Sequence, residues 1–143
     1  MSAHEGLVGT WKLASWTTEI VATKERFKLF GEHPRGYLHF TESGRTFAVL
    51  TADGRASVQN DEDQINAFRT LVAYSGRYRI EGNRLTTKVD VSADPAWVGI
   101  EMIRYFTLEG DQLEIVTAPF VSPKSGHPAG TNLLRSFLSW HRE

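Results

Sequence analysis

The chain has 143 residues, of which 41% are apolar and 23% are charged, and its formal net charge is -1. This composition is ordinary for one globular domain. The balance of charges argues against nucleic acid or an anionic membrane as a partner, and no apolar run approaches the ~20 residues that span a bilayer. The absence of cysteine excludes disulfides and thiolate chemistry, and the first residues lack a secretory signal pattern, so we expect a cytoplasmic protein.

Short stretches of alternating apolar and polar residues, separated by turn residues, recur along the chain and predict strands. No change of composition marks a domain boundary, so residues 1–143 are expected to form a single domain. Residues 118–130 are rich in proline and glycine and are expected to form a loop. In chain order, the predicted strands span residues 8–21, 26–29, 36–41, 45–51, 76–80, 84–91, 97–108, 112–117 and 133–140.

One amphipathic helix around residues 61–74 interrupts these strands. Asn60 suits the N-cap position, and acidic residues fill the first turn, where the helix dipole favours them. Apolar residues follow at helical spacing, namely Ile65, Phe68, Leu71 and Val72. We expect this apolar stripe to lie on one end or on the outer wall of the sheet.

Turns at Ser43-Gly44, Gly82-Asn83 and Gly110-Asp111 set the register of three hairpins. The facing pairs that follow are Phe40 with Phe47, Ile80 with Leu85, and Leu108 with Leu113. A β-bulge would reverse the faces of one segment, and we expect one near Gly99. Period-two alternation turns a further set of residues to the same interior face, namely Leu38, Val49, Tyr78, Thr87, Val89, Val91, Ile100, Met102, Arg104, Phe106, Ile115 and Thr117.

Eight or nine strands joined by tight turns predict an all-β fold, a closed antiparallel meander barrel, with an open two-sheet sandwich as the alternative. Trp11 in the first strand and Arg142 in the last can stack on each other where such a barrel closes. A small closed barrel has a hollow interior that can hold a small molecule.

The segment from Leu7 to Leu13, which contains Gly9-Thr10-Trp11, resembles the opening of lipocalin-like domains. An ordered series of further segments is similar to the same family and extends to Arg142. The Thr-Asp-x-x-x-Tyr block of secreted lipocalins is missing, so the resemblance is to the small, mostly microbial lipocalin-like domains with a calycin-type barrel. It implies a barrel with a pocket, and some similar barrels act in secondary metabolism as cofactor-independent cyclases or isomerases. The further segments are residues 34–38, 73–78, 91–92, 95–99, 104–106 and 108–113.

Arg104 is the strongest candidate for function, because a guanidinium on the apolar face of a strand must find an acceptor. It would anchor a carboxylate, enolate or phenolate of a ligand. The alternative is a structural salt bridge inside the barrel. The acidic residues available for that salt bridge are Asp90, Glu101 and Glu114.

Tyr78 is the second candidate for a polar contact to the ligand, or for catalysis together with Arg104. Its alternative is a wall tyrosine bonded to the backbone or to Thr87. Trp97 lies at a strand entrance, where it would stack on a ligand or close one end. The full set of predicted ligand-binding residues is Arg104, Tyr78, Thr87, Phe40, Phe106, Met102 and Trp97.

The sequence carries no pattern for a metal or a cofactor. His39 is predicted on the face opposite Phe40, and no histidines have metal-ligand spacing. A nucleophile elbow, a phosphate-binding glycine loop and a dinucleotide fingerprint are all missing. We therefore expect neither a metal nor a cofactor.

Three functions remain open. The leading one is binding of a small, largely apolar, anionic or oxygenated metabolite inside the barrel. The second is a cofactor-independent isomerase, cyclase or hydratase acting on a ketone-bearing, polyketide-like metabolite, which would gain from Tyr78 or His39 within hydrogen-bond reach of Arg104. The third is a barrel filled by its own aromatic residues that binds a protein partner or forms a homodimer.

Overall fold

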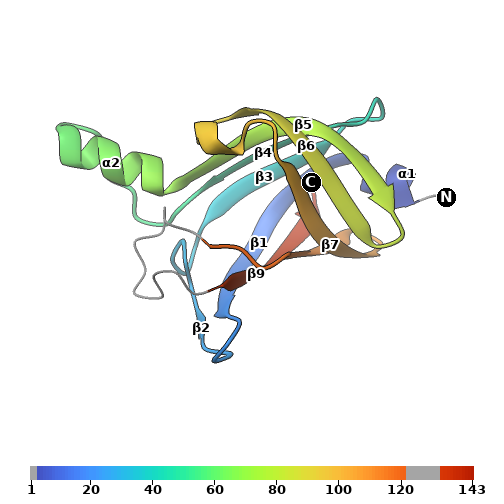
Figure 1. Ribbon diagram of the computed structural model, residues 1–143, viewed down its shortest axis with the longest axis horizontal. Helices are drawn as coiled ribbons and strands as arrows, with labels where there is room; N and C mark the ends of the chain where they lie inside the picture. Colours follow the sequence, from blue (N-terminus) through green and yellow to red (C-terminus); the bar gives the residue numbers. More distant parts are fainter. Residues whose placement is uncertain (1–2, 122–132) are drawn as a thin grey trace.

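The computed structural model of the protein describes residues 3–121 and 133–143, and most of this part is antiparallel sheet (Figure 1). From β3 to β9, each strand pairs with the next strand in the chain, and β1 pairs with both β3 and β9. Eight strands thus close into a barrel, while the short β2 pairs only with the end of β1. The predicted meander barrel is confirmed. The elements are α1 (Ala3–Leu7), β1 (Gly9–Ile20), β2 (Arg26–Phe27), β3 (Arg35–Phe40), β4 (Arg45–Thr51), α2 (Asp61–Arg69), β5 (Leu71–Glu81), β6 (Arg84–Ser92), the 3₁₀ turn η1 (Pro95–Trp97), β7 (Glu101–Glu109), β8 (Gln112–Thr117) and β9 (Leu134–Arg142).

The barrel closes where Trp11 of β1 pairs with Arg142 of β9. The Arg142 guanidinium lies 4.3 Å from the centroid of the fully buried Trp11 ring. It donates hydrogen bonds to the carbonyl oxygens of Gly6 (2.6 Å) and Val8 (3.0 Å) and to the carboxylate of Asp111 (3.1 Å). The stacked pair that the sequence predicts is therefore present. Through Arg142 it links β9 to β1 and to the backbone at Gly6 and Val8, where α1 ends.

Two of the three predicted hairpin registers are confirmed, and the third is wrong by one residue. Ile80 faces Leu85 and Leu108 faces Leu113, whereas Phe40 faces Thr46 instead of Phe47.

The reason for this error is a three-residue turn at residues 42–44, which begins and ends at the facing pair Thr41 and Arg45. Gly44 has a φ of 95°, as the last residue of such a turn requires. A shift of one residue reverses the faces of a strand. Phe47 and Val49 are therefore exposed, and the β4 residues that are buried instead are Thr46, Ala48 and Leu50.

A β-bulge in β6 reverses the predicted face of Val91. Ser75 faces Val91 but Gly76 faces Val89, so Asp90 is an extra residue in β6. Val91 is consequently 64% exposed rather than buried in the interior. A side chain at Gly76 would collide with the Lys88 carbonyl oxygen, which explains the glycine opposite the bulge.

The bulge predicted near Gly99 is confirmed by the backbone hydrogen bonds. The Gly99 N–H donates to the Val89 carbonyl oxygen at 2.8 Å, and the Val89 N–H donates to the Ile100 carbonyl oxygen at 3.1 Å, so two residues lie opposite Val89. Gly99 precedes β7 in a turn with a φ of 91°. The pairing of β6 with β7 is regular from Lys88 with Glu101 to Arg84 with Tyr105.

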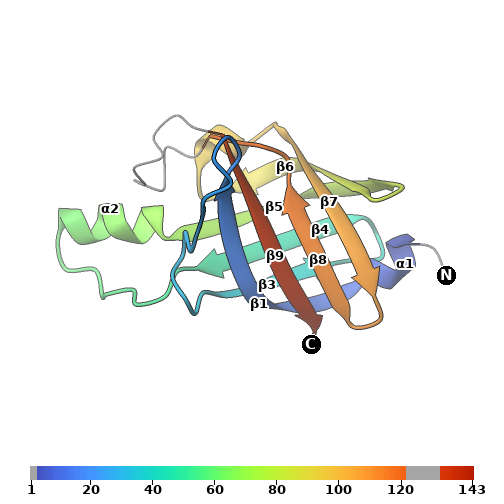
Figure 2. The ribbon, with the colours of Figure 1, turned by 90° about the horizontal axis from the view of Figure 1, so that it is seen from below.

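The helix α2 is shorter than predicted and does not pack on the barrel as expected. The Asn60 side chain caps it by accepting from the Asp63 N–H, as predicted. It ends at Arg69, and residues 71–74 begin β5 instead. No residue of α2 is buried, and Figures 1 and 2 show it extending beyond the barrel end opposite α1.

Candidate functional site

A cavity of about 570 Å³ occupies the interior of the barrel, within the roughly 300–1,000 Å³ usual for small-molecule sites. Inward side chains of β1 and of β3 to β9 line it, and most of them are apolar. This space contradicts a barrel filled by its own aromatic residues, which was one part of the third function considered above. Representative apolar lining residues are Trp16, Leu38, Leu50, Leu85, Met102 and Leu138.

Five of the seven predicted ligand-binding residues line the cavity, and two do not. The five are Arg104, Thr87, Phe40, Met102 and Trp97. Tyr78 and Phe106 are buried in the packed core outside the lining.

Tyr78 packs edge-on against Phe40, with ring centroids 5.1 Å apart, and its hydroxyl donates to the Thr41 carbonyl oxygen at 2.9 Å. Burial raises the pKa of the Tyr78 hydroxyl. The ligand contact predicted for Tyr78 is therefore corrected to the wall role, because its hydroxyl bonds the β3–β4 turn. Phe106 is inward, as predicted, but is packed in the core.

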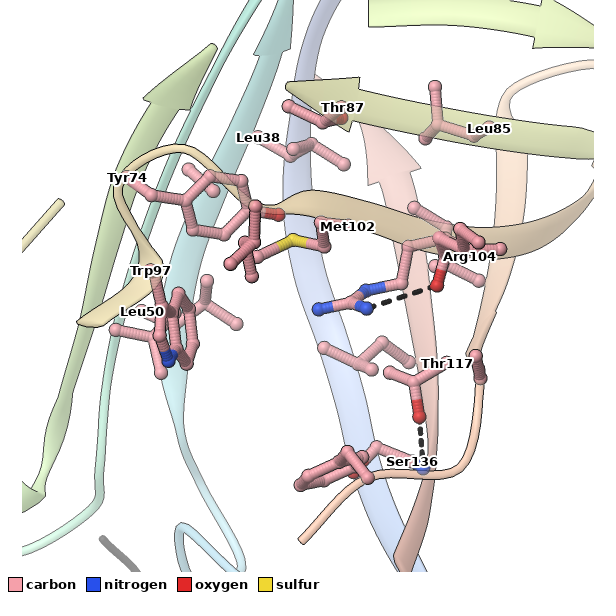
Figure 3. Close-up of a pocket in the computed structure, with 18 of the residues that line it drawn as sticks. Leu38, Leu50, Tyr74, Leu85, Thr87, Trp97, Met102, Arg104, Thr117 and Ser136 are labelled. Atoms are coloured by element: carbon pink, nitrogen blue, oxygen red, sulfur yellow. Dashed lines mark hydrogen bonds between the residues drawn. The ribbon is translucent and has the colours of Figure 1, made fainter. Parts of the chain in front are cut away.

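Arg104 extends from β7 into the cavity (Figure 3). Among the described residues, its one hydrogen bond is from Nη1 to the Ile103 carbonyl oxygen, at 3.1 Å. A guanidinium has five N–H donors, so most of its donors have no acceptor in the described protein. Burial lowers the pKa of Arg104, because the surroundings solvate its charge poorly.

The carboxylates considered as salt-bridge partners of Arg104 bind elsewhere. Asp90 accepts two hydrogen bonds from Arg45, at 3.0 and 2.8 Å. Glu101 pairs with Arg79 at 3.2 Å, and Glu114 accepts from the Ser139 hydroxyl. In the described part of the chain, the salt-bridge interpretation of Arg104 is wrong.

Tyr74 lines the same cavity, and the sequence analysis missed it. Its ring packs against Trp97 with centroids 5.9 Å apart. Burial raises the pKa of the Tyr74 hydroxyl, and the charge of Arg104 lowers it by a smaller amount. The missed signal is the alternation of Val72 and Tyr74, which continues the strand phase of Gly76 and Tyr78, although both residues fall within the predicted helix at 61–74.

The rim of the cavity includes η1 and the chain after β8. Asp94 caps η1 by accepting from the Ala96 N–H at 3.0 Å, which holds Trp97 at the rim. Residues 118–121 also line the cavity, and Phe120 bridges to Leu134. The rest of the loop predicted at 118–130 falls outside the described residues.

No metal centre is found among the described residues. Residues 3–121 and 133–143 contain no group of three histidine or acidic side chains that could hold a metal ion. His39 faces outward, as predicted, and its Nδ1 lies 2.8 Å from the Thr10 hydroxyl. None of the helices in those residues is long and apolar enough to cross a bilayer.

Comparison with known proteins adds one family and one fold. A family model described as a lipocalin-like domain matches residues 8–143. A solved structure described as "Structure of EF1p2_mFAP2b bound to DFHBI" is similar over 99% of this chain and 97% of that chain, with 16% identity and a TM-score of 0.50. At this identity the likeness concerns the fold alone. No match is found among the curated proteins.

Proposed function

The chain belongs to the family of lipocalin-like domains, and we propose that it binds a small, largely apolar molecule carrying one anionic or oxygen-rich group. The observation that carries this proposal is the guanidinium of Arg104, which projects into an apolar cavity of about 570 Å³ and has no carboxylate partner in the described chain. Arg104 anchors the polar group, while Met102, Thr87 and Trp97 contact the rest of the molecule.

Desolvation of the Arg104 guanidinium is the energetic reason to expect an anionic ligand. A guanidinium withdrawn from water without an acceptor is costly, and the described residues offer the part-buried Arg104 one acceptor, the Ile103 carbonyl. A ligand oxyanion would provide two acceptor oxygens for the planar fork of the guanidinium. The net gain for such a charged hydrogen bond is about 1.5–3 kcal/mol, which corresponds to an affinity difference of ten-fold or more.

The isomerase, cyclase or hydratase alternative has less support. It would gain from Tyr78 or His39 within hydrogen-bond reach of Arg104, but the Tyr78 hydroxyl donates to Thr41 and His39 bonds Thr10 on the outer face. Neither group is available as a proton acceptor in the cavity.

The test is binding of three aromatic acids and their uncharged amides, measured by isothermal titration calorimetry. The acids are naphthalene-2-carboxylate, anthracene-2-carboxylate and cinnamate. We expect at least one acid to bind at least ten-fold more tightly than its amide. Arg104→Met should remove this difference, and the matched control Arg79→Met, at an exposed arginine paired with Glu101, should retain it.

Two results would overturn the proposal. One is binding of acids and amides with equal affinity in the wild-type protein. The other is the absence of binding by all six compounds.

A further inference from the structure

Two hydrogen-bond donors face the same part of the cavity from different strands. Figure 3 shows the ring of Tyr74 and the side chain of Arg104 extending toward each other, with Met102 between them. Within residues 3–121 and 133–143, the Tyr74 hydroxyl makes no hydrogen bond, and Arg104 makes one, to the Ile103 carbonyl oxygen. Their electrostatic interaction places the two groups in one local environment.

The Tyr74 hydroxyl acts as a donor toward an anion. Because burial raises its pKa by more than Arg104 lowers it, the phenol keeps its proton at ordinary pH. A neutral phenol beside a cationic guanidinium makes a paired donor site for one oxyanion. The tyrosine also holds an aromatic surface against Trp97, which suits a flat, conjugated ligand.

The other charged groups of the cavity lie at its rim. Arg69 and Glu101 are exposed, and Glu101 is already paired with Arg79. Asp94 is half-buried and caps η1.

The strands that pair with β7 present no titratable group to Arg104. Its partner residues across those strands are Leu85 and Thr117, and Thr87 is a further inward residue of β6. Tyr74 and Arg104 thus dominate the charge balance at the centre of the site.

We infer that the cavity binds weakly acidic hydroxyl compounds, conjugated phenols or enols, as their oxyanions, and that binding releases one proton to solvent. This inference rests on the proposed function of the same cavity. The O–H bond of the ligand breaks, the electron pair stays on the ligand oxygen, and the proton passes to the buffer. The neutral ligand would leave Arg104 without an anionic partner, whereas the oxyanion accepts from both Arg104 and Tyr74.

The physical basis is the difference between the two bound forms. An apolar cavity alone favours the neutral form of an acid and raises its pKa, whereas a nearby cation lowers it. Here the guanidinium is part-buried, and desolvation lowers its pKa, so the incoming anion neutralises a charge that its surroundings solvate poorly. Delocalised phenolates and enolates are also less strongly hydrated than small anions, which makes their transfer into the cavity less costly.

The experiment uses 4-methylumbelliferone, whose excitation spectrum distinguishes the phenol from the phenolate. Bound probe is titrated with pH on the full chain, and its midpoint is compared with that of free probe. We expect the midpoint to fall by about one pKa unit or more on the wild-type protein, a ten-fold change in the ionisation ratio. The methyl ether, 7-methoxy-4-methylcoumarin, cannot ionise, and its affinity should not change over the same pH range.

Variants separate the two donors. Arg104→Met should bring the midpoint to or above that of the free probe, and Tyr74→Phe should reduce the downward shift without abolishing it. The matched control Tyr105→Phe changes an exposed tyrosine on the outer face of β7 and should leave the shift unchanged. If Arg104→Met fails to fold, the smaller downward shift expected for Tyr74→Phe still tests the inference.

Failure of this inference differs from failure of the proposed function. If naphthalene-2-carboxylate binds through Arg104 but the umbelliferone is not bound, or is bound with an unchanged or raised midpoint, the inference is overturned and the proposed function stands. If neither the umbelliferone nor any of the three acids and their amides binds, both are overturned.

Discussion

Arg142 and Arg104 belong to strands of the same barrel but have opposite surroundings. The guanidinium of Arg142 stacks on Trp11 and donates to two carbonyl oxygens and one carboxylate. Among the described residues, the guanidinium of Arg104 has one hydrogen bond, to the carbonyl oxygen of the adjacent residue. The donors of the first arginine are thus used within the described fold, whereas most donors of the second have no acceptor there.

Two tyrosines of β5 repeat this contrast. Tyr78 donates its hydroxyl to the Thr41 carbonyl and supports the β3–β4 turn. Tyr74, four residues earlier on the same face, has a hydroxyl without a hydrogen bond to the described chain and lines the cavity. The same face of β5 thus carries a tyrosine bonded to the fold at one position and a tyrosine that lines the cavity at another.

The largest loss of stability is expected when Arg142, the arginine bonded within the fold, is replaced. Arg142→Met should lower the free energy of unfolding by about 2–4 kcal/mol, because it removes the cation–π contact and leaves the Gly6 and Val8 carbonyls without their donor. Urea denaturation followed by tryptophan fluorescence measures it. A loss below about 0.5 kcal/mol would show that the closure of the barrel does not depend on this side chain.

The structural tyrosine should give a smaller loss. Tyr78→Phe keeps the ring against Phe40 and removes only the hydrogen bond to Thr41, so we expect a decrease of about 1 kcal/mol. The same urea titration measures the decrease. Binding of naphthalene-2-carboxylate should be unchanged, and a ten-fold loss of its affinity would place Tyr78 in the site after all.

The cavity arginine should have little effect on the unliganded fold. Arg104→Met replaces a poorly solvated charge by an apolar side chain of similar length, so we expect the free energy of unfolding to stay within about 1 kcal/mol of wild type or to rise. Thermal unfolding by circular dichroism measures it. A loss as large as that of Arg142→Met would assign Arg104 to the fold.

Tyr74→Phe should give the smallest change in stability, within about 0.5 kcal/mol, because no hydrogen bond to the described chain is lost. Differential scanning calorimetry against Tyr78→Phe tests this directly. Equal losses in the two variants would remove the contrast between them.

The barrel and much of the site could be predicted from the sequence, because both depend on local alternation and short turns. Arg104 could be placed inside because the Gly110-Asp111 turn fixes the phase of β7 and β8. The face of Val91 could not, because an inserted residue such as Asp90 changes the phase without altering composition. Tyr74 was missed because Leu71 and Val72 fit both helical and strand spacing. Which carboxylates bind Arg45 and Arg79 depends on strands distant in the chain.

The most direct test of the account is the free energy of unfolding of wild type and Arg104→Met, each with and without naphthalene-2-carboxylate at about 100 times its wild-type dissociation constant. The account predicts similar stabilities without ligand, a gain of about 2.7 kcal/mol for the liganded wild type, and a much smaller gain for the variant. A variant that is already several kcal/mol less stable, yet gains as much from the carboxylate as wild type does, would contradict it.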